Sequence, residues 1–303
     1  MTTVQHSTRA LKARPALADT RTRARTKRSA RPFGRIGLYL LVLLWLIATL
    51  GPYIVMAVTS LTPESQLVSQ GSTLFPSHVT FNAYVELFKS TAFLNYVRNS
   101  AAAAIGTVVF SLIVAVCAAI SLSRFRFHGR TAMLTALLVA QLFPAVLLVI
   151  PLSVELRQAN LLNSIWGLIL VYTTFASPFA TYLLKGFLDG LPAELDEAAR
   201  IDGCSSLQMI WYVILPLLRP GLTAAGTYIF IFSWNEFLYA LTFTSTSASQ
   251  TIPVGLQLFI GDYEIRWDLL TAGGVIAAIP VLVGFMFVQR QLIGGLAAGA
   301  VKG

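Results

Sequence analysis

Long apolar segments separated by short polar ones fill the sequence from about residue 36 onward. Six windows of roughly 20 mostly apolar residues are each long enough to cross a hydrocarbon core about 30 Å thick. Lipid cannot satisfy backbone N–H and C=O groups, so each window is expected to be helical. The pattern therefore predicts an all-α integral membrane protein with six transmembrane helices at about residues 36–58, 99–122, 132–154, 165–185, 221–243 and 271–290.

Composition and charge placement support this topology. The chain is 56% hydrophobic and only 12% charged, whereas a soluble domain carries about 25% charged residues. It has 22 Lys and Arg residues, and all but Lys89, Arg98, Arg157 and Arg266 fall on one side of the six predicted spans. The positive-inside rule then predicts that both termini are cytoplasmic, N-in and C-in. The net charge of +9 follows from this topology, so nucleic acid is not expected as a partner.

The first 35 residues form a separate compositional segment. Residues 1–35 are rich in Arg, Ser, Thr and Ala and contain a single acid, Asp19. This composition also fits a mitochondrial transit peptide, but a disordered basic cytoplasmic arm that holds the first span N-in is favoured. The membrane domain is accordingly predicted to cover residues 36–303.

A polar segment between the fourth and fifth spans is predicted to form a short helix. Pro192 can occupy the first helical position, where its missing N–H is harmless. Asp196 and Arg200 are spaced as an i, i+4 ion pair, and Gly203 supplies a left-handed stop. The segment Leu191–Gly203 therefore predicts a helix of about eleven residues, roughly 16 Å long at 1.5 Å per residue.

One side of that predicted helix is small. The residues expected to share it are Leu195, Ala198, Ala199 and Asp202. Two adjacent alanines let another surface approach closely, which suits a docking helix. From composition alone, an ordinary cytoplasmic hairpin stabilised by its own caps explains the segment equally well.

The loop also carries a recognisable spacing. Glu197-Ala198-Ala199, then Gly203, then Val213 and Leu215-Pro216 resemble the loop signature of permease subunits in bacterial ABC importers, with Val213 in place of the usual Ile. Further segments resemble the maltose-type, carbohydrate-uptake branch of that family and its G-subunit type of permease. They are Thr80–Tyr84, Asn99-Ser100, Ser233–Phe237 and Gly295–Gly303. The resemblance covers about residues 36–303.

The resemblance implies a role for the loop and a set of partners. The short helix, Glu194–Gly203, would dock on ATPase subunits and transmit their closure. The implied ATPase-coupling residues are Glu194, Glu197, Ala198, Ala199, Arg200, Asp202, Gly203, Leu215 and Pro216. The implied partners are two ATPase subunits, a second homologous permease, an external solute-binding protein, a sugar and membrane lipid. ATP and Mg would belong to the ATPase subunits, with no cofactor in this chain, and the location would be the bacterial plasma (inner) membrane, multi-pass.

Polar residues within the predicted spans are candidates for the translocation pathway or a subunit interface. Glu236 lies well inside the fifth predicted span, where a charge costs about 2.5–3.5 kcal/mol unless it faces a partner or water. A structural hydrogen bond within this chain is the alternative explanation. The full set of candidates is Trp234, Asn235, Glu236, Gln141 and Tyr172.

Several functional classes lack their motifs here. The sequence has no G-x-x-x-x-G-K-[ST] phosphate loop and no His-Glu-x-x-His or metal-spaced Cys/His cluster, so the chain is not predicted to be an enzyme. The main prediction is the permease subunit of an ATP-driven importer of di- or oligosaccharides. The alternatives are an importer permease for an amino acid, phosphate or glycerol phosphate, an ion-coupled secondary transporter, and a non-transporting membrane scaffold.

Overall fold

The computed structural model of the protein describes residues 32–72, 74–89, 91–261 and 264–300. Apart from one isolated β-bridge between Ile260 and Ile265, these residues form helices and their connections. The predicted all-helical class is therefore confirmed for the described residues. The first helix begins at Pro32, inside the segment predicted to be an arm, and residues 1–31 lie outside the described ranges.

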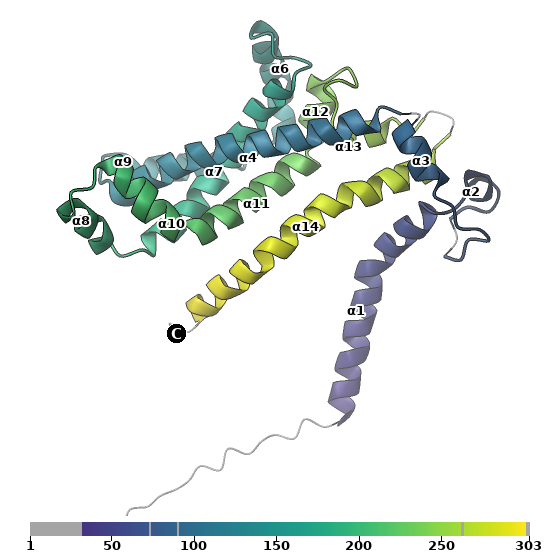
Figure 1. Ribbon diagram of the computed structural model, residues 1–303, viewed down its shortest axis with the longest axis horizontal. Coiled ribbons are helices and arrows are strands. Elements are labelled where there is room, and N and C mark those ends of the chain that lie inside the picture. Colours follow the sequence, from purple (N-terminus) through teal and green to yellow (C-terminus); the bar gives the residue numbers. More distant parts are fainter. Residues whose placement is uncertain (1–31, 73, 90, 262–263, 301–303) are drawn as a thin grey trace, which may run out of the picture. The chain divides into compact units, whose positions relative to one another are not determined.

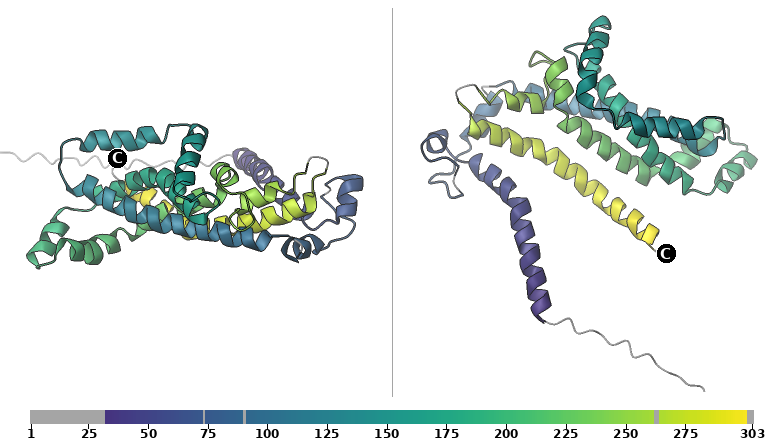
Figure 2. Two further views of the ribbon diagram at one scale, coloured as in Figure 1. Left: turned by 90° about the horizontal axis from the view of Figure 1, so that it is seen from above. Right: turned by 180° about the vertical axis from the view of Figure 1, so that it is seen from behind.

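The chain folds into helices of very different lengths, which Figures 1 and 2 show from three directions. In order they are α1 (Pro32–Thr59), α2 (Glu64–Gln70), α3 (Asn82–Lys89), α4 (Phe93–Arg124), α5 (Arg130–Ala140), η1 (Ala145–Leu148), α6 (Val149–Gln158), α7 (Ile165–Asp189), α8 (Glu194–Ile201), α9 (Ser206–Met209), η2 (Ile210–Ile214), α10 (Leu215–Leu217), α11 (Arg219–Asn235), α12 (Leu238–Phe243), α13 (Ile252–Gln257) and α14 (Trp267–Ala300). The chain divides into two units at Leu50/Gly51, within α1. All the sites described below belong to the second unit.

Four helices are long and apolar enough to cross a membrane. They are α1, α4, α7 and α14, counted from Ile36 in α1 and to Met286 in α14. Two further segments qualify only as bent pairs: α5 with η1–α6, bent by 95°, and residues 206–217 with α11, bent by 78°. By length and composition the described residues therefore contain four spans, or six if each bent pair is one span.

Two of the predicted spans are not continuous helices. The window 132–154 breaks between Ala140 and Ala145, where Pro144 is extended and precedes the 3₁₀ turn η1. Proline lacks an N–H and disfavours helix in the residue before it, which explains the break. The window 221–243 breaks at Glu236, whose backbone is extended between α11 and α12.

The core of the second unit is built around α4, α7 and α11, which pack along one another (Figure 1). Small residues line the α4–α7 contact, including Ala103, Ala115 and Ala180, each fully buried. At Gly106 a methyl group would lie 2.5 Å from Cδ1 of Ile169. Small side chains at helix interfaces allow such close approach of backbones, as in other membrane helix pairs.

A polar network holds the connection between α12 and α13. Asn163, with a left-handed φ of 54°, accepts hydrogen bonds from the backbone N–H groups of Ser245 (2.9 Å) and Thr246 (3.1 Å) and from the Ser249 hydroxyl. From α4, the Asn99 amide donates to the Gln250 carbonyl at 2.8 Å. Residues far apart in the sequence thus fix this loop in place.

A second polar cluster joins α2, α3 and the start of α14. Arg266 forms ion pairs with Glu64 (2.9 Å), Glu86 (3.1 Å) and Asp268 (3.0 Å). Its hydrogen bonds to Asp268 and Glu86, and the charge of Glu64, raise the pKa of the Arg266 guanidinium. The cluster ties α2 and α3 to the start of α14.

Candidate functional site

The predicted docking helix exists but is shorter than the sequence indicates. It is α8, eight residues from Glu194 to Ile201, rather than about eleven from Leu191. Pro192 lies outside it, and Ala193 is its N-cap. Three acids lie in its first turn and Arg200 in its last, the arrangement that the helix dipole favours.

The end of α8 is a Schellman motif. The N–H of Gly203 donates to the Arg200 carbonyl and the N–H of Cys204 to the Ala199 carbonyl, both at 3.0 Å. Gly203 has φ +82°, and a Cβ added there would meet nothing within 4 Å. The predicted left-handed stop is confirmed, and glycine is favoured by backbone conformation rather than by crowding.

The two alanines of α8 do not share a face. Ala199 is only 5% exposed and packs in an apolar cluster with Leu188, Met209 and Ile214. Ala198 is exposed, as are the remaining predicted coupling residues of this stretch: Glu194, Glu197, Arg200, Asp202 and Gly203. The predicted small face that includes both alanines is therefore wrong: one alanine anchors the helix while the other lies on its outer surface.

Asp196 connects α8 to a distant helix. Its carboxylate pairs with Nε of Arg124 at 2.8 Å, at the end of α4, instead of with Arg200 as the i, i+4 spacing predicts. Arg124 also donates to the Leu191 carbonyl at 3.3 Å, and Ser123 donates to Asp189 at 2.7 Å. The last turn of α4 thus holds both ends of the α7–α8 connection.

The chain continues from α8 into a second helical segment, residues 206–217. Ser205 and Gln208 form a reciprocal capping box at its start, which satisfies two backbone donors. A π-helical turn, η2, follows, and the predicted residues Leu215 and Pro216 lie in α10, just before the bend into α11. This segment links α8 mechanically to α11 through one short bend.

Glu236 does not lie in mid-helix. Its two carboxylate oxygens accept hydrogen bonds from the backbone N–H groups of Tyr239 (2.9 Å) and Ala240 (3.1 Å), so it caps α12. Asn235 is the exposed last residue of α11, and its amide donates to the Ile231 carbonyl at 2.8 Å. The placement of Glu236 inside a continuous span is thus wrong, because its side chain competes with the helix for backbone donors.

The remaining pathway candidates are placed differently from one another. Trp234 is 5% exposed, and its indole N–H donates to the Ala277 carbonyl of α14 at 3.0 Å. Tyr172 is fully buried in α7, close enough to Glu236 for the two side chains to interact electrostatically. Trp234 therefore packs α11 on α14, whereas Tyr172 lies beside the α11–α12 break.

Tyr239, which the sequence did not single out, joins the two broken spans. Its hydroxyl donates to the Ala145 carbonyl of η1 at 2.9 Å, and its ring stacks on Phe175 at 5.0 Å. Gln141, exposed at the end of α5, donates to the Phe175 carbonyl at 3.1 Å. Gln141, Tyr172 and Glu236 therefore surround one junction, which we call the break junction. From the sequence, this junction could have been indicated only by recognising that the apolar windows 132–154 and 221–243 are both interrupted.

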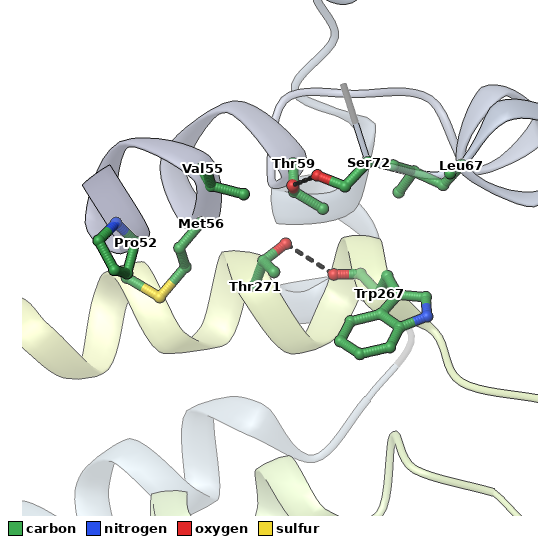
Figure 3. Close-up of a pocket in the computed structure, with 9 residues that line it drawn as sticks. Pro52, Val55, Met56, Thr59, Leu67, Ser72, Trp267 and Thr271 are labelled. Atoms are coloured by element: carbon green, nitrogen blue, oxygen red, sulfur yellow. Dashed lines mark hydrogen bonds between the residues drawn. The ribbon is translucent and has the colours of Figure 1, made fainter. Parts of the chain in front are cut away.

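A separate cavity of about 470 Å³ lies away from α8 and the break junction, between the last turns of α1 and the start of α14 (Figure 3). Pro52, Met56 and Trp267 line it. Its polar members are already paired: Thr59 with Ser72 at 2.7 Å, and Thr271 with the Trp267 carbonyl at 2.6 Å. This cavity holds none of the predicted functional residues.

Comparisons with known proteins place the chain in a family. Residues 108–294 match the family model described as "Binding-protein-dependent transport system inner membrane component". The chain is 35% identical over 271 residues to the diacetylchitobiose uptake system permease protein DasC of Streptomyces coelicolor, covering 89% of this chain and 98% of DasC. It is 36% identical over 270 residues to the trehalose transport system permease protein SugB of Mycobacterium tuberculosis, covering 88% and 94%.

A solved structure agrees with this match. The chain resembles a subunit of a bacterial ABC transporter involved in the import of the acidic polysaccharide alginate, with a TM-score of 0.75 and 27% identity over 87% of this chain and 97% of that one. The fold and the loop therefore define a membrane subunit of an importer. The chain belongs to the family of binding-protein-dependent transport system inner membrane components, and it is a permease subunit of an ABC importer.

Proposed function

We propose that this chain is one of two permeases in an ATP-driven importer of di- or oligosaccharides in the bacterial plasma membrane. The observation that carries the proposal is α8, an exposed acidic helix closed by a Schellman motif and anchored to α4 by Arg124. Membership of the importer family and the uptake systems named for its relatives support it.

The proposed topology keeps six spans, with the bent pair of α5 and η1–α6 as the third and the fifth running through α11. Segment 206–217 lies at the cytoplasmic surface, and both termini and α8 are in the cytoplasm. The Lys and Arg distribution supports this orientation. In this arrangement Glu194, Glu197, Ala198 and Arg200 present α8 to an ATPase subunit. ATP and Mg bind to two such subunits, and hydrolysis occurs there.

The proposed coupling mechanism follows from how α8 is connected. Closure of the ATPase subunits moves α8, and because Ala199 is packed in the core and Asp196 is bonded to Arg124, the motion passes to α4 and α7. Segment 206–217 carries the same motion through Leu215 and Pro216 into α11. Because of these attachments, α8 is proposed to move together with α4, α7 and α11 rather than as a free loop.

The proposed pathway element is the break junction. Gln141, Asn235 and Glu236 supply amide and carboxylate groups that can pair with sugar hydroxyls, and irregular backbone at membrane depth is expected where a polar cavity is lined. Asn235 is exposed next to the junction and Glu236 is half-buried. Trp234 holds the end of α11 against α14, because its indole N–H donates to the Ala277 carbonyl. The second permease and an external solute-binding protein complete the site.

Reconstitution of the co-expressed complex into liposomes tests the proposal. Uptake of labelled trehalose and diacetylchitobiose is compared with uptake of phosphate and glutamate, in the presence of the solute-binding protein and internal ATP. We expect uptake of a sugar that vanadate inhibits. A protonophore should leave the rate of that uptake unchanged. Uptake of phosphate or glutamate alone would reject the sugar assignment, and collapse of uptake with protonophore would reject ATP coupling.

A further inference from the structure

A second cavity, of about 580 Å³, lies beside the α8 end of the molecule, between the last turns of α4 and segment 206–217. Its walls are almost wholly apolar, with Leu112, Val116 and Ile120 on one side and Leu207, Ile210 and Trp211 on the other. The volume falls within the range of about 300–1,000 Å³ typical of small-ligand sites. We call this cavity the α4 groove.

The α4 groove lies where a span meets the membrane surface. Its α4 residues, from Leu112 to Ser121, belong to the second half of the candidate span Phe93–Arg124. The opposite wall bends by 78° away from α11 and exposes Trp211 and Tyr212. Trp and Tyr are enriched at the boundary between hydrocarbon and headgroups. The groove therefore opens at the level where acyl chains meet their headgroups.

Two arginines lie close in the chain to residues that line the groove. Arg126 follows the lining residue Phe125, and Arg219 precedes the lining residue Leu222 by three positions on α11, one helical turn on the same face. Both are exposed, and neither forms an ion pair with another described residue. Basic residues at apolar clefts between transmembrane helices on the cytoplasmic side bind anionic lipid headgroups.

We infer that the α4 groove binds one anionic phospholipid of the cytoplasmic leaflet, with an acyl chain against Val116 and Ile210 and the phosphate between Arg126 and Arg219. Apolar walls exclude a hydroxyl-rich solute as occupant, and the flanking charges favour an anionic lipid over a zwitterionic one. The inference rests on the proposed orientation but not on the transported solute.

The bound lipid has a mechanical consequence. Ile210, Trp211 and Leu215 form part of the groove wall and also lie in the segment that connects α8 to α11. An acyl chain there fills the space between α4 and the segment that carries the motion of α8. Transport is therefore expected to depend on anionic lipid.

Cys117 provides a direct probe, since it lines the groove and is exposed. The complete importer, with Cys204→Ser and with its partners' cysteines substituted, is labelled at Cys117 with benzophenone maleimide. It is then irradiated in vesicles of equal phosphatidylglycerol and phosphatidylcholine. We expect lipid adducts enriched in phosphatidylglycerol. The matched control carries Val114→Cys with Cys117→Ser, which places the probe on an exposed position of α4 outside the groove. It should give adducts in the vesicle ratio.

Removal of the flanking charges tests the headgroup contact. Arg126→Gln and Arg219→Gln should each lower phosphatidylglycerol enrichment at Cys117 by roughly fivefold, the factor for about 1 kcal/mol per basic residue at an anionic surface. Arg157→Gln, an exposed arginine in α6, should leave the enrichment unchanged.

Three results would overturn the inference: a cross-link from Cys117 to the second permease, the same lipid ratio at Cys117 as at the Val114→Cys probe, or full enrichment in the double arginine variant. Sugar uptake is measured in the same vesicles. Absent uptake with phosphatidylglycerol enrichment intact would count against the proposed transport function alone, so the two failures are distinguishable.

Discussion

The two ends of the α4–α7–α11 core are stabilised in different ways. At the α8 end, local motifs close the helices: a Schellman motif joins residues 199–204 and a capping box joins Ser205 and Gln208. The last turn of α4 adds the Arg124–Asp196 ion pair and hydrogen bonds to Asp189 and to the Leu191 carbonyl. At the other end, Asn163 and Asn99 hold the α12–α13 connection from more than 80 residues away.

This difference indicates which end can move as a unit. A helix with its own caps keeps its shape when it shifts, because its hydrogen bonds travel with it. A loop held by distant side chains loses its shape when those side chains separate. The α8 end is therefore suited to transmit motion, and the Asn163 end to remain fixed.

Asn163→Ala is expected to have the largest effect, on stability. It removes about three hydrogen bonds, worth about 1 kcal/mol each, and adds a left-handed penalty of about 1 kcal/mol, so we expect a loss of 3–4 kcal/mol. Thermal inactivation of the purified complex measures it. Asn163→Gly keeps the backbone conformation and should be about 1 kcal/mol milder; equal stability of wild type and both variants would show that the α12–α13 connection does not depend on Asn163.

Arg124→Gln should give the next largest effect, on coupling. It leaves Asp196, whose side chain is only 13% exposed, without its charged partner. An unpaired, largely buried group costs roughly 2 kcal/mol, and the change frees α8 from α4. We expect transport to fall while ATP hydrolysis by the complex continues. The exchange Arg124→Asp with Asp196→Arg should restore part of the transport. Unchanged transport in Arg124→Gln would show that the Arg124–Asp196 ion pair does not transmit the motion of α8.

Gly203→Asp should spare membrane insertion and reduce coupled transport. The left-handed backbone at φ +82° costs a non-glycine residue about 1–2 kcal/mol, and the added charge would lie at the proposed docking surface. Gly203→Asn is the matched uncharged control, since Asn tolerates this conformation better. Normal uptake at normal expression in Gly203→Asp would contradict a docking role for this end of α8.

Glu236→Gln is expected to have the smallest structural effect, because the amide oxygen can still accept one of the two cap bonds, a loss of about 1 kcal/mol. Glu236→Leu removes both. We expect Glu236→Leu to impair sugar uptake more than co-purification with the ATPase subunits. Equal loss of uptake and co-purification would assign Glu236 to folding rather than to the pathway.

Much of the architecture could be predicted from the sequence because it depends on local or compositional physics. Apolar length predicts helices in lipid, and the four uninterrupted windows became α1, α4, α7 and α14. The acids before Ala198 and the glycine at 203 predicted α8 and its stop. The E-A-A spacing indicated the importer permease family, which the family match confirms.

The sequence by itself thus determined the helical class, the family, and the position of α8 with its left-handed end. Only the tertiary structure decided which alanine is buried, that Asp196 pairs with Arg124, and that Glu236 caps α12 beside Tyr172 and Tyr239. The physical reason is the distance along the chain over which each interaction acts. Caps, dipoles and apolar length act over a few residues, whereas burial and ion pairing depend on which distant segments the fold brings into contact.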